Sequence, residues 1–189
     1  MLPSHWLCCM LSPGKEEASN EALFESLLFL EEQRQAEEMK RKDLVRLRRK
    51  YDGATLLIVA SVAGDLKLVE LLLELGACPK ESDDSGNTAL LVACFGSHHF
   101  PIVKALVEAG APVSYSNKEG TSPVAAAAWR GRLQILQYLV TVAAQGGGGV
   151  KGGRSLLDCV DSQGRTPRDL AHEWGHSTVV AWIDEQQNA

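Results

Sequence analysis

Four segments of similar apolar and polar pattern follow one another between residues 51 and 186. Each segment opens with a glycine, has a Thr or Ser two residues later, and continues with a short apolar stretch. These hydroxyl residues are spaced 33, 34 and 44 residues apart, and the longest interval contains the run GGGGVKGG. They are Thr55, Thr88, Ser122 and Thr166. A repeat of this length predicts a solenoid, in which stacking of the units buries one continuous core.

Each unit is predicted to contain two helices. The Thr or Ser suits the N-cap of a short first helix, and prolines follow it in the third and fourth units. An alanine recurs where two helices must approach closely, at Ala60, Ala93, Ala127 and Ala171. A glycine then ends the helix, at Gly64, Gly131 and Gly175. The second helix carries apolar pairs that predict a core-facing side, at Leu68–Val69, Ile102–Val103, Ile135–Leu136 and Val179–Val180.

In the first two units the second helix ends at Gly76–Ala77 and Gly110–Ala111. With these helix ends, the glycine–hydroxyl turns and the helix-breaking glycines, the segment 51–186 resembles the ankyrin-repeat family. The resemblance implies an all-α solenoid of about four helix-turn-helix repeats with short β-turn tips. It places the units at about 51–80, 84–114, 118–144 and 162–186, with a flexible Gly-rich insertion at 145–155. The family's Thr-Pro-Leu-His box is eroded, because its histidine position holds Ile58, Leu91, Ala125 and Asp169. We expect this erosion to lower the stability of the array.

The segment before the repeats predicts a disordered tail over residues 1–19 and a charged amphipathic helix over residues 20–50. Glutamates gather early in this helix and Lys or Arg late, which suits the helix dipole. We expect the ends of the helix to pack on the first repeat. An alternative is that the basic stretch KRKDLVRLRRK (40–50) acts as a nuclear-import signal or anion contact in a nuclear or regulatory protein.

The composition of the chain limits which binding partners and which cellular compartment are expected. Hydrophobic residues make up 45% and charged residues 23% of the chain, as in ordinary globular proteins, and a net charge of −5 gives no general attraction to nucleic acid. The five cysteines have no metal-ligand spacing and fit a reducing compartment. Nothing approaches the apolar length of a membrane span. We therefore expect a monomer in the cytoplasm, with the nucleus as the alternative, that binds no nucleic acid.

The sequence HEWGH (172–176) matches H-E-x-x-H, the zinc-binding helix of many metalloproteases. The downstream positions at which metzincins carry a glycine and a third histidine hold Val179 and Trp182. In the register of the repeats, Gly175 and His176 instead form the turn between two helices, and the glycine would break the helix that zinc requires. We predict no enzyme activity, no metal and no cofactor, with a zinc hydrolase as the remote alternative.

In the ankyrin-repeat family, partners usually dock in a concave groove lined by the turn tips and the exposed side of the first helix. The resemblance therefore implies a non-catalytic adaptor that binds another protein. By register, the turn-tip candidates are Asp84, Ser85, Asn87, Lys118, Glu119, Thr121, Ser162, Gln163 and Arg165. The first-helix candidates are Phe95, Trp129, Arg130, Glu173 and Trp174.

Trp129 and Arg130 form the predicted centre of this groove, because aromatic and Arg side chains are enriched in binding hot spots. The alternative is that Trp129 and Trp174 fold over the second helix as ordinary packing. Trp182 is assigned to the core-facing side of the last helix.

Overall fold

A computed structural model describes residues 45–50, 52–96, 99–145 and 155–188. The chain divides into two units, Met1–Leu44 and Val45–Ala189, and all described residues belong to the second. The predicted tail over 1–19, most of the predicted helix over 20–50 and most of the Gly-rich insertion lie outside the described residues. None of the helices in the described part is both long enough and apolar enough to cross a membrane.

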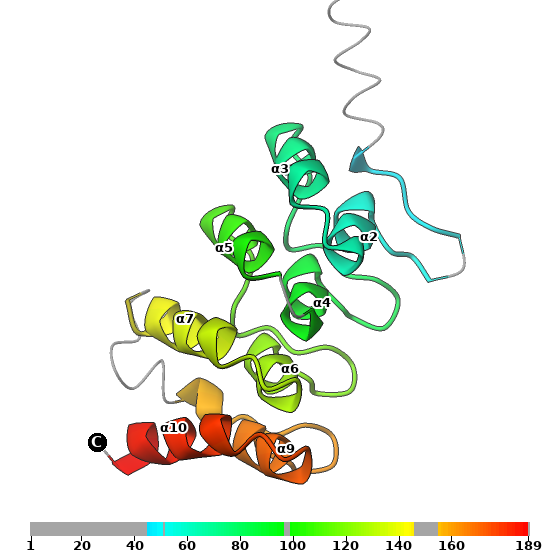
Figure 1. Cartoon of the computed structure of the whole chain (residues 1–189). Helices are drawn as coiled ribbons and strands as arrows, with labels where there is room; N and C mark the ends of the chain where they lie inside the picture. Colours follow the sequence, from blue (N-terminus) through cyan, green and yellow to red (C-terminus); the bar gives the residue numbers. More distant parts are fainter. Residues whose placement is uncertain (1–44, 51, 97–98, 146–154, 189) are drawn as a thin grey trace, which may run out of the picture. The chain divides into compact units, whose positions relative to one another are not determined.

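The second unit is a stack of four helix pairs (Figure 1). The first helices are α2 (Leu56–Ala63), α4 (Ala89–Phe95), α6 (Pro123–Trp129) and α9 (Pro167–Glu173). The second helices are α3 (Leu66–Glu74), α5 (Phe100–Glu108), α7 (Leu133–Ala143) and α10 (Ser177–Asn188). Each first helix packs on the second helix of its own pair and on the first helix of the next pair. The predicted all-α solenoid of helix-turn-helix repeats is confirmed.

The first helices begin where the sequence predicts, for the predicted chemical reason. The hydroxyl groups of Thr55 and Thr88 accept from backbone N–H groups three residues later, each at 3.3 Å. Ser122 and Thr166 do the same at 3.1 and 3.2 Å. Each bond satisfies an N–H that has no partner within the helix, which typically stabilises a helix by about 1 kcal/mol.

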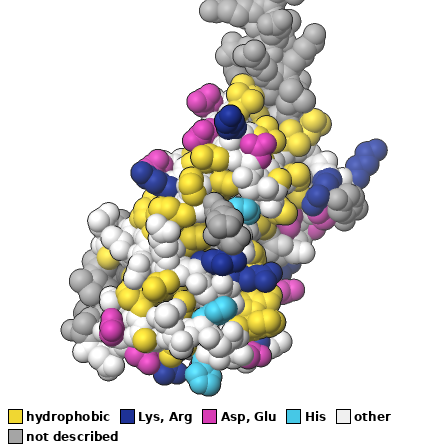
Figure 2. Space-filling view, viewed as in Figure 1, with side chains coloured by type: hydrophobic (Ala, Val, Ile, Leu, Met, Phe, Trp, Pro, Cys, Tyr) yellow, Lys and Arg dark blue, Asp and Glu magenta, His cyan; other side chains and the backbone are white. Residues whose placement is uncertain are grey.

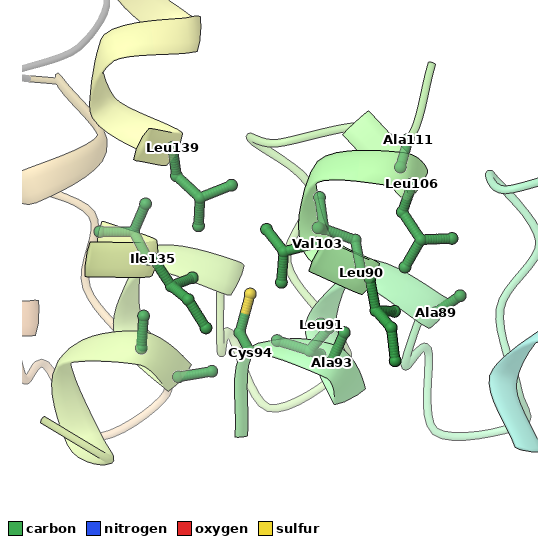
Figure 3. Packing of buried hydrophobic residues seen from close by; sticks show 14 of the residues in the cluster. Ala89, Leu90, Leu91, Ala93, Cys94, Val103, Leu106, Ala111, Ile135 and Leu139 are labelled. Atoms are coloured by element: carbon green, nitrogen blue, oxygen red, sulfur yellow. The ribbon is translucent and has the colours of Figure 1, made fainter. Parts of the chain in front are cut away.

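Small residues allow the first helices to pack closely. The recurring alanines, from Ala60 to Ala171, are at most 1% exposed. Larger side chains from both helix layers surround them, including Leu90, Val103 and Leu139 in the second and third repeats (Figure 3). The first repeat differs from this pattern, because Leu68 of the predicted core-facing pair is 41% exposed while Val69 is fully buried.

The residues that directly follow the Gly-rich insertion belong to the core. Ser155–Leu157 form a helical turn near α7 and α10 (Figure 1). Leu156 and Leu157 are 5% and 0% exposed, and Asp158 accepts a hydrogen bond from Gln187 of α10 at 3.2 Å. The segment between the insertion and the fourth repeat therefore supplies side chains to the core, which the sequence did not predict.

The carboxyl end of the predicted helix 20–50 needs correction. Arg48 forms an isolated β-bridge with Thr55, and the backbone N–H of Arg49 donates to the carbonyl of Ala54 at 2.9 Å. The Arg48 guanidinium also donates to the carbonyl of Ser82 at 2.8 Å and to Glu81 at 2.9 Å. Residues 48–50 therefore belong to the turn of the first repeat, because the backbone groups of Arg48 and Arg49 bond to residues of that turn.

Candidate partner-binding surface

The predicted contact residues fall into two rows. The turn row comprises Asp84, Ser85, Asn87, Lys118, Glu119, Thr121, Ser162, Gln163 and Arg165. The helix-end row comprises Phe95, Trp129, Arg130, Glu173 and Trp174, at the carboxyl ends of α4, α6 and α9. Both rows run across successive repeats, because each repeat supplies residues at the same register.

Backbone hydrogen bonds join neighbouring turns of the turn row. The N–H of Asp84 donates to the carbonyl of Asp52 at 2.9 Å, that of Lys118 to Ser85 at 3.1 Å, and that of Ser162 to Glu119 at 2.9 Å. The turn tips therefore form a continuous ladder, in which the backbone of each repeat fixes the position of the next.

Each of the last three turns is also held by one Asp or Asn that the sequence analysis missed. Asp83, Asn117 and Asp161 each accept hydrogen bonds from two backbone N–H groups, two and four residues later. This is the local bonding that makes Asp and Asn frequent in turns. Their common position, five residues before the capping hydroxyl, is the sequence signal that could have identified them.

The environment of Asp161 changes its acidity. Burial alone would raise the pKa of this carboxyl group, but hydrogen bonds from the backbone and guanidinium of Arg165 and from the backbone of Gln163 outweigh that effect. The pKa of Asp161 is therefore lowered in the folded protein. The carboxylate form is the one that holds the fourth turn together.

Two predicted contact residues of the turn row are engaged inside the protein. The side chain of Asn87 donates to Asp83 and accepts from Asn117, both at 2.9 Å. Arg165 donates to Asp161 at 2.9 Å and to Glu173 at 3.1 Å. The exposed members of the row are Asp84, Ser85, Lys118, Glu119, Ser162 and Gln163, whereas Thr121 is half-buried.

The aromatic members of the helix-end row touch one another across three repeats. The ring centroids of Phe95 and Trp129 lie 5.4 Å apart with an interplanar angle of 86°. Those of Trp129 and Trp174 lie 5.7 Å apart at 63°. Such edge contacts typically contribute about 0.5–1.5 kcal/mol each beyond the burial of area. Phe95 and Trp129 are half-buried, while Trp174 is 56% exposed.

Arg130 lies over this aromatic surface. Its guanidinium carbon is 5.3 Å from the ring centroid of Trp129 and 5.8 Å from that of Phe95. A cation in this position is attracted by the negative face of the ring, by about 0.5–1 kcal/mol at an exposed site. The row therefore presents apolar area and a positive charge together. Trp182, by contrast, packs against the core as predicted.

The HEWGH segment does not form a zinc-binding helix. Helix α9 ends at Glu173, Trp174 is its C-cap, and Gly175 has a φ of 74°. His172 is exposed, whereas Nε2 of His176 lies 3.0 Å from the carbonyl oxygen of Trp129. The two histidines therefore do not share a helix, and within the described part of the chain no three His, Cys, Asp or Glu residues are grouped as metal ligands would be.

His176 instead connects the third and fourth repeats. Its ring lies so close to Gly131 that a Cβ added at that glycine would come within 2.5 Å of Nδ1. Gly131 also has a φ of 67°, which favours glycine. The final histidine of the motif thus helps to hold the carboxyl end of α6, where Trp129 and Arg130 lie.

Comparison with known proteins agrees with this architecture. The chain matches the family described as "Ankyrin repeats (3 copies)" over residues 17–117 and 57–149. It is similar to Cyclin-dependent kinase inhibitor 2A of Monodelphis domestica, with 35% identity over 127 residues, which is 67% of each chain. It is 34% identical to Ankyrin repeat domain-containing protein 63 of Homo sapiens over 136 residues, which is 70% of this chain and 34% of that protein.

A third relative is Cyclin-dependent kinase 4 inhibitor B of Rattus norvegicus, with 30% identity over 128 residues, 67% of this chain and 88% of that protein. The chain thus spans about two thirds of the first of these relatives and about one third of the second. The repeat register, the stacked helix pairs and these matches together assign the chain to the ankyrin-repeat family.

Proposed function

We propose that this protein is a non-catalytic binding module that holds a segment of another protein against the helix-end row. The single observation that supports this most is the edge-to-face contact of Phe95, Trp129 and Trp174 across three repeats, with Trp174 left 56% exposed. An exposed Trp on a fixed aromatic base offers a large contact area without much loss of side-chain freedom on binding. The exposed side chains of the turn row would supply further polar contacts.

The relatives suggest a candidate for the partner. Two of them are named as inhibitors of cyclin-dependent kinases, and each aligns over about two thirds of this chain. A cyclin-dependent kinase is therefore the first protein to test. The similarity to Ankyrin repeat domain-containing protein 63 covers as much of the chain. The kinase is therefore one candidate partner, and the proposed binding surface does not depend on it.

The decisive experiment measures binding of the purified full chain to purified cyclin-dependent kinase 4, with Trp174→Ala as the test variant. Leu71→Ala is the matched control, because Leu71 is also an exposed apolar residue, 49% exposed, but lies on α3 in the other helix layer. Loss of a hot-spot Trp is expected to weaken binding by about 30-fold, equivalent to about 2 kcal/mol. The control should bind as the unaltered protein does.

The outcomes separate the surface from the partner. Equal binding by the unaltered protein and Trp174→Ala would reject the helix-end row as the kinase contact. No binding by the unaltered protein would reject the kinase and leave the row to be tested with other ligands. Circular dichroism of both variants should match that of the unaltered protein, since neither side chain is buried.

The alternative function, a nuclear or regulatory protein that uses the basic stretch 40–50, has its own test. Arg48 is held by Glu81 and Ser82, so its substitution would disturb the first repeat as well as any signal. Changing Lys40, Arg41 and Lys42 to Gln avoids this problem. A nuclear-import role predicts that the variant leaves the nucleus, whereas the proposed cytoplasmic location predicts no change in a tagged protein's distribution.

A further inference from the structure

We propose that the helix-end row recognises a linear protein segment in which an acidic residue stands next to a large apolar residue. This inference rests on the proposed function and adds the chemistry of the partner. Its starting point is the positive charge of Arg130, which has no ion-pair partner among the described residues.

Arg130 is exposed, and within the described residues its guanidinium forms no ion pair. Its interactions there are the contacts with the rings of Trp129 and Phe95. The other charged member of the row, Glu173, is bonded to Arg165 at 3.1 Å. Of the two charged members of the row, Arg130 is therefore the one without an ion-pair partner among the described residues.

The other repeats have no charged side chain at the register of Arg130, and the carboxylate of the row, that of Glu173, is bonded to Arg165. At the register of Arg130, the other repeats have Ala63, Gly96 and Trp174. Arg132 adds to the positive character nearby, because it too forms no ion pair in the described part and its buried Nε has no hydrogen-bond partner there. On the face drawn in Figure 2, Lys and Arg side chains lie beside His and hydrophobic side chains near the middle.

A carboxylate is the anion that best fits this arrangement. A guanidinium binds a carboxylate through two parallel N–H···O bonds, and its charge is more effective beside aromatic rings than in open water. Phosphate-binding sites in proteins that read phosphopeptides typically use clusters of Arg side chains. Here Arg130 is the exposed guanidinium, whereas Arg132 is half-buried with a buried Nε, and one exposed guanidinium suits the single charge of Asp or Glu.

Apolar contacts are available on both sides of Arg130. Trp174 lies in the fourth repeat, and the position of Phe95 in the first repeat is taken by Val62, which is 61% exposed. An extended segment that crosses the repeats could therefore place an acidic residue at Arg130 and a large apolar side chain against Trp174. Burial of that side chain would contribute about 25 cal/mol for each Å² removed from water.

The test uses the full chain, immobilised, and a displayed library of random twelve-residue peptides. The unaltered protein is expected to enrich peptides with Asp or Glu next to Trp, Phe or Leu. Arg130→Glu should instead enrich peptides with Lys or Arg at that position, and Leu71→Ala should select as the unaltered protein does. A peptide chosen by the unaltered protein should bind Arg130→Glu at least about 10-fold more weakly, an effect that weakens with added salt.

Each contrary result has a distinct meaning. The acidic partner would be overturned if the selected peptides show no acidic enrichment, or if they bind Arg130→Glu as tightly as the unaltered protein. The proposed surface would still stand in that case if Trp174→Ala fails to bind the same peptides. Full retention of the peptides by Trp174→Ala would overturn the surface itself. Failure to enrich any peptide would overturn recognition of a linear segment. Tighter binding of a selected peptide whose acidic residue is replaced by phosphoserine would mean that the partner is a phosphopeptide and not a carboxylate-bearing segment.

Discussion

The turn row and the helix-end row cross the same repeats, but they use their side chains differently. In the turn row, backbone bonds join successive turns, and Asp83, Asn117 and Asp161 satisfy the N–H groups within each turn. In the helix-end row, the contacts are between aromatic rings, and Arg130 has no anionic partner in the described residues. The turns mainly hold the array together. The helix ends present side chains that have few hydrogen-bond or ion-pair partners within the described part of the protein.

This difference refines the choice of contact residues. Polar residues at turn tips resemble binding residues in the sequence, but Asn87 and Arg165 already have partners inside the protein. A ligand that used them would have to replace these bonds. The exposed Trp174, and Arg130, which has no ion pair in the described part of the chain, can gain contacts without losing any comparable ones. Binding energy is therefore expected to concentrate there.

The largest expected effect comes from Gly120→Ala in the turn row. Gly120 has a φ of 77°, and an added Cβ would lie 2.9 Å from the backbone nitrogen of Ser162 in the next turn. The left-handed conformation and the clash together should lower the free energy of unfolding by about 2–4 kcal/mol. Urea unfolding followed by circular dichroism measures the change.

Gly164→Ala is the matched control for this prediction. Gly164 has nearly the same φ, 76°, but nothing lies within 4 Å of an added Cβ. Its substitution should cost only the conformational strain, about 1–2 kcal/mol. Equal losses in the two variants would mean that contact between successive turns contributes little to stability.

A smaller effect is expected from His176→Ala, which removes support from the helix-end row. The variant loses the hydrogen bond to the carbonyl of Trp129 and the contact with Gly131. The free energy of unfolding should fall by about 1–2 kcal/mol. His172→Ala serves as the control within the same motif, since His172 is exposed and should change stability by less than about 0.5 kcal/mol.

Similar losses for both histidines would contradict the separate positions that the structure gives them. Zinc titration of the unaltered protein adds an independent check on the motif. A zinc-dependent rise in melting temperature that both variants abolish would favour joint metal binding, which the break in the helix at Gly175 opposes.

Features that depend on local chemistry could be predicted from the sequence. The N-caps, such as Thr55, and the helix-ending glycines, such as Gly175, each involve bonds within a few residues. The repeat register then placed Phe95, Trp129 and Trp174 at equivalent helix ends. It could do so because successive repeats stack with the same geometry.

Features that depend on distant contacts could not be predicted. Arg48 continues a helical charge pattern in the sequence, but it bonds to Glu81 and Ser82, more than thirty residues away. Leu157 follows a Gly-rich run that reads as a linker, yet it is fully buried beside the core. Neither contact leaves a trace in the local pattern, because each partner comes from another repeat.

The smallest expected effect concerns pH and the turn row. The lowered pKa of Asp161 means that its carboxylate stabilises the folded state above its unfolded pKa of about 4, and that this contribution is lost as pH falls through the lower folded value. Asp161→Asn should keep the two backbone bonds, as Asn117 does in the third turn, but should lose the ion pair with Arg165. Urea unfolding between pH 3 and 7 should therefore show a shallower loss of stability on acidification than in the unaltered protein. An identical pH dependence would mean that the Asp161–Arg165 pair adds nothing to the stability of the fourth turn.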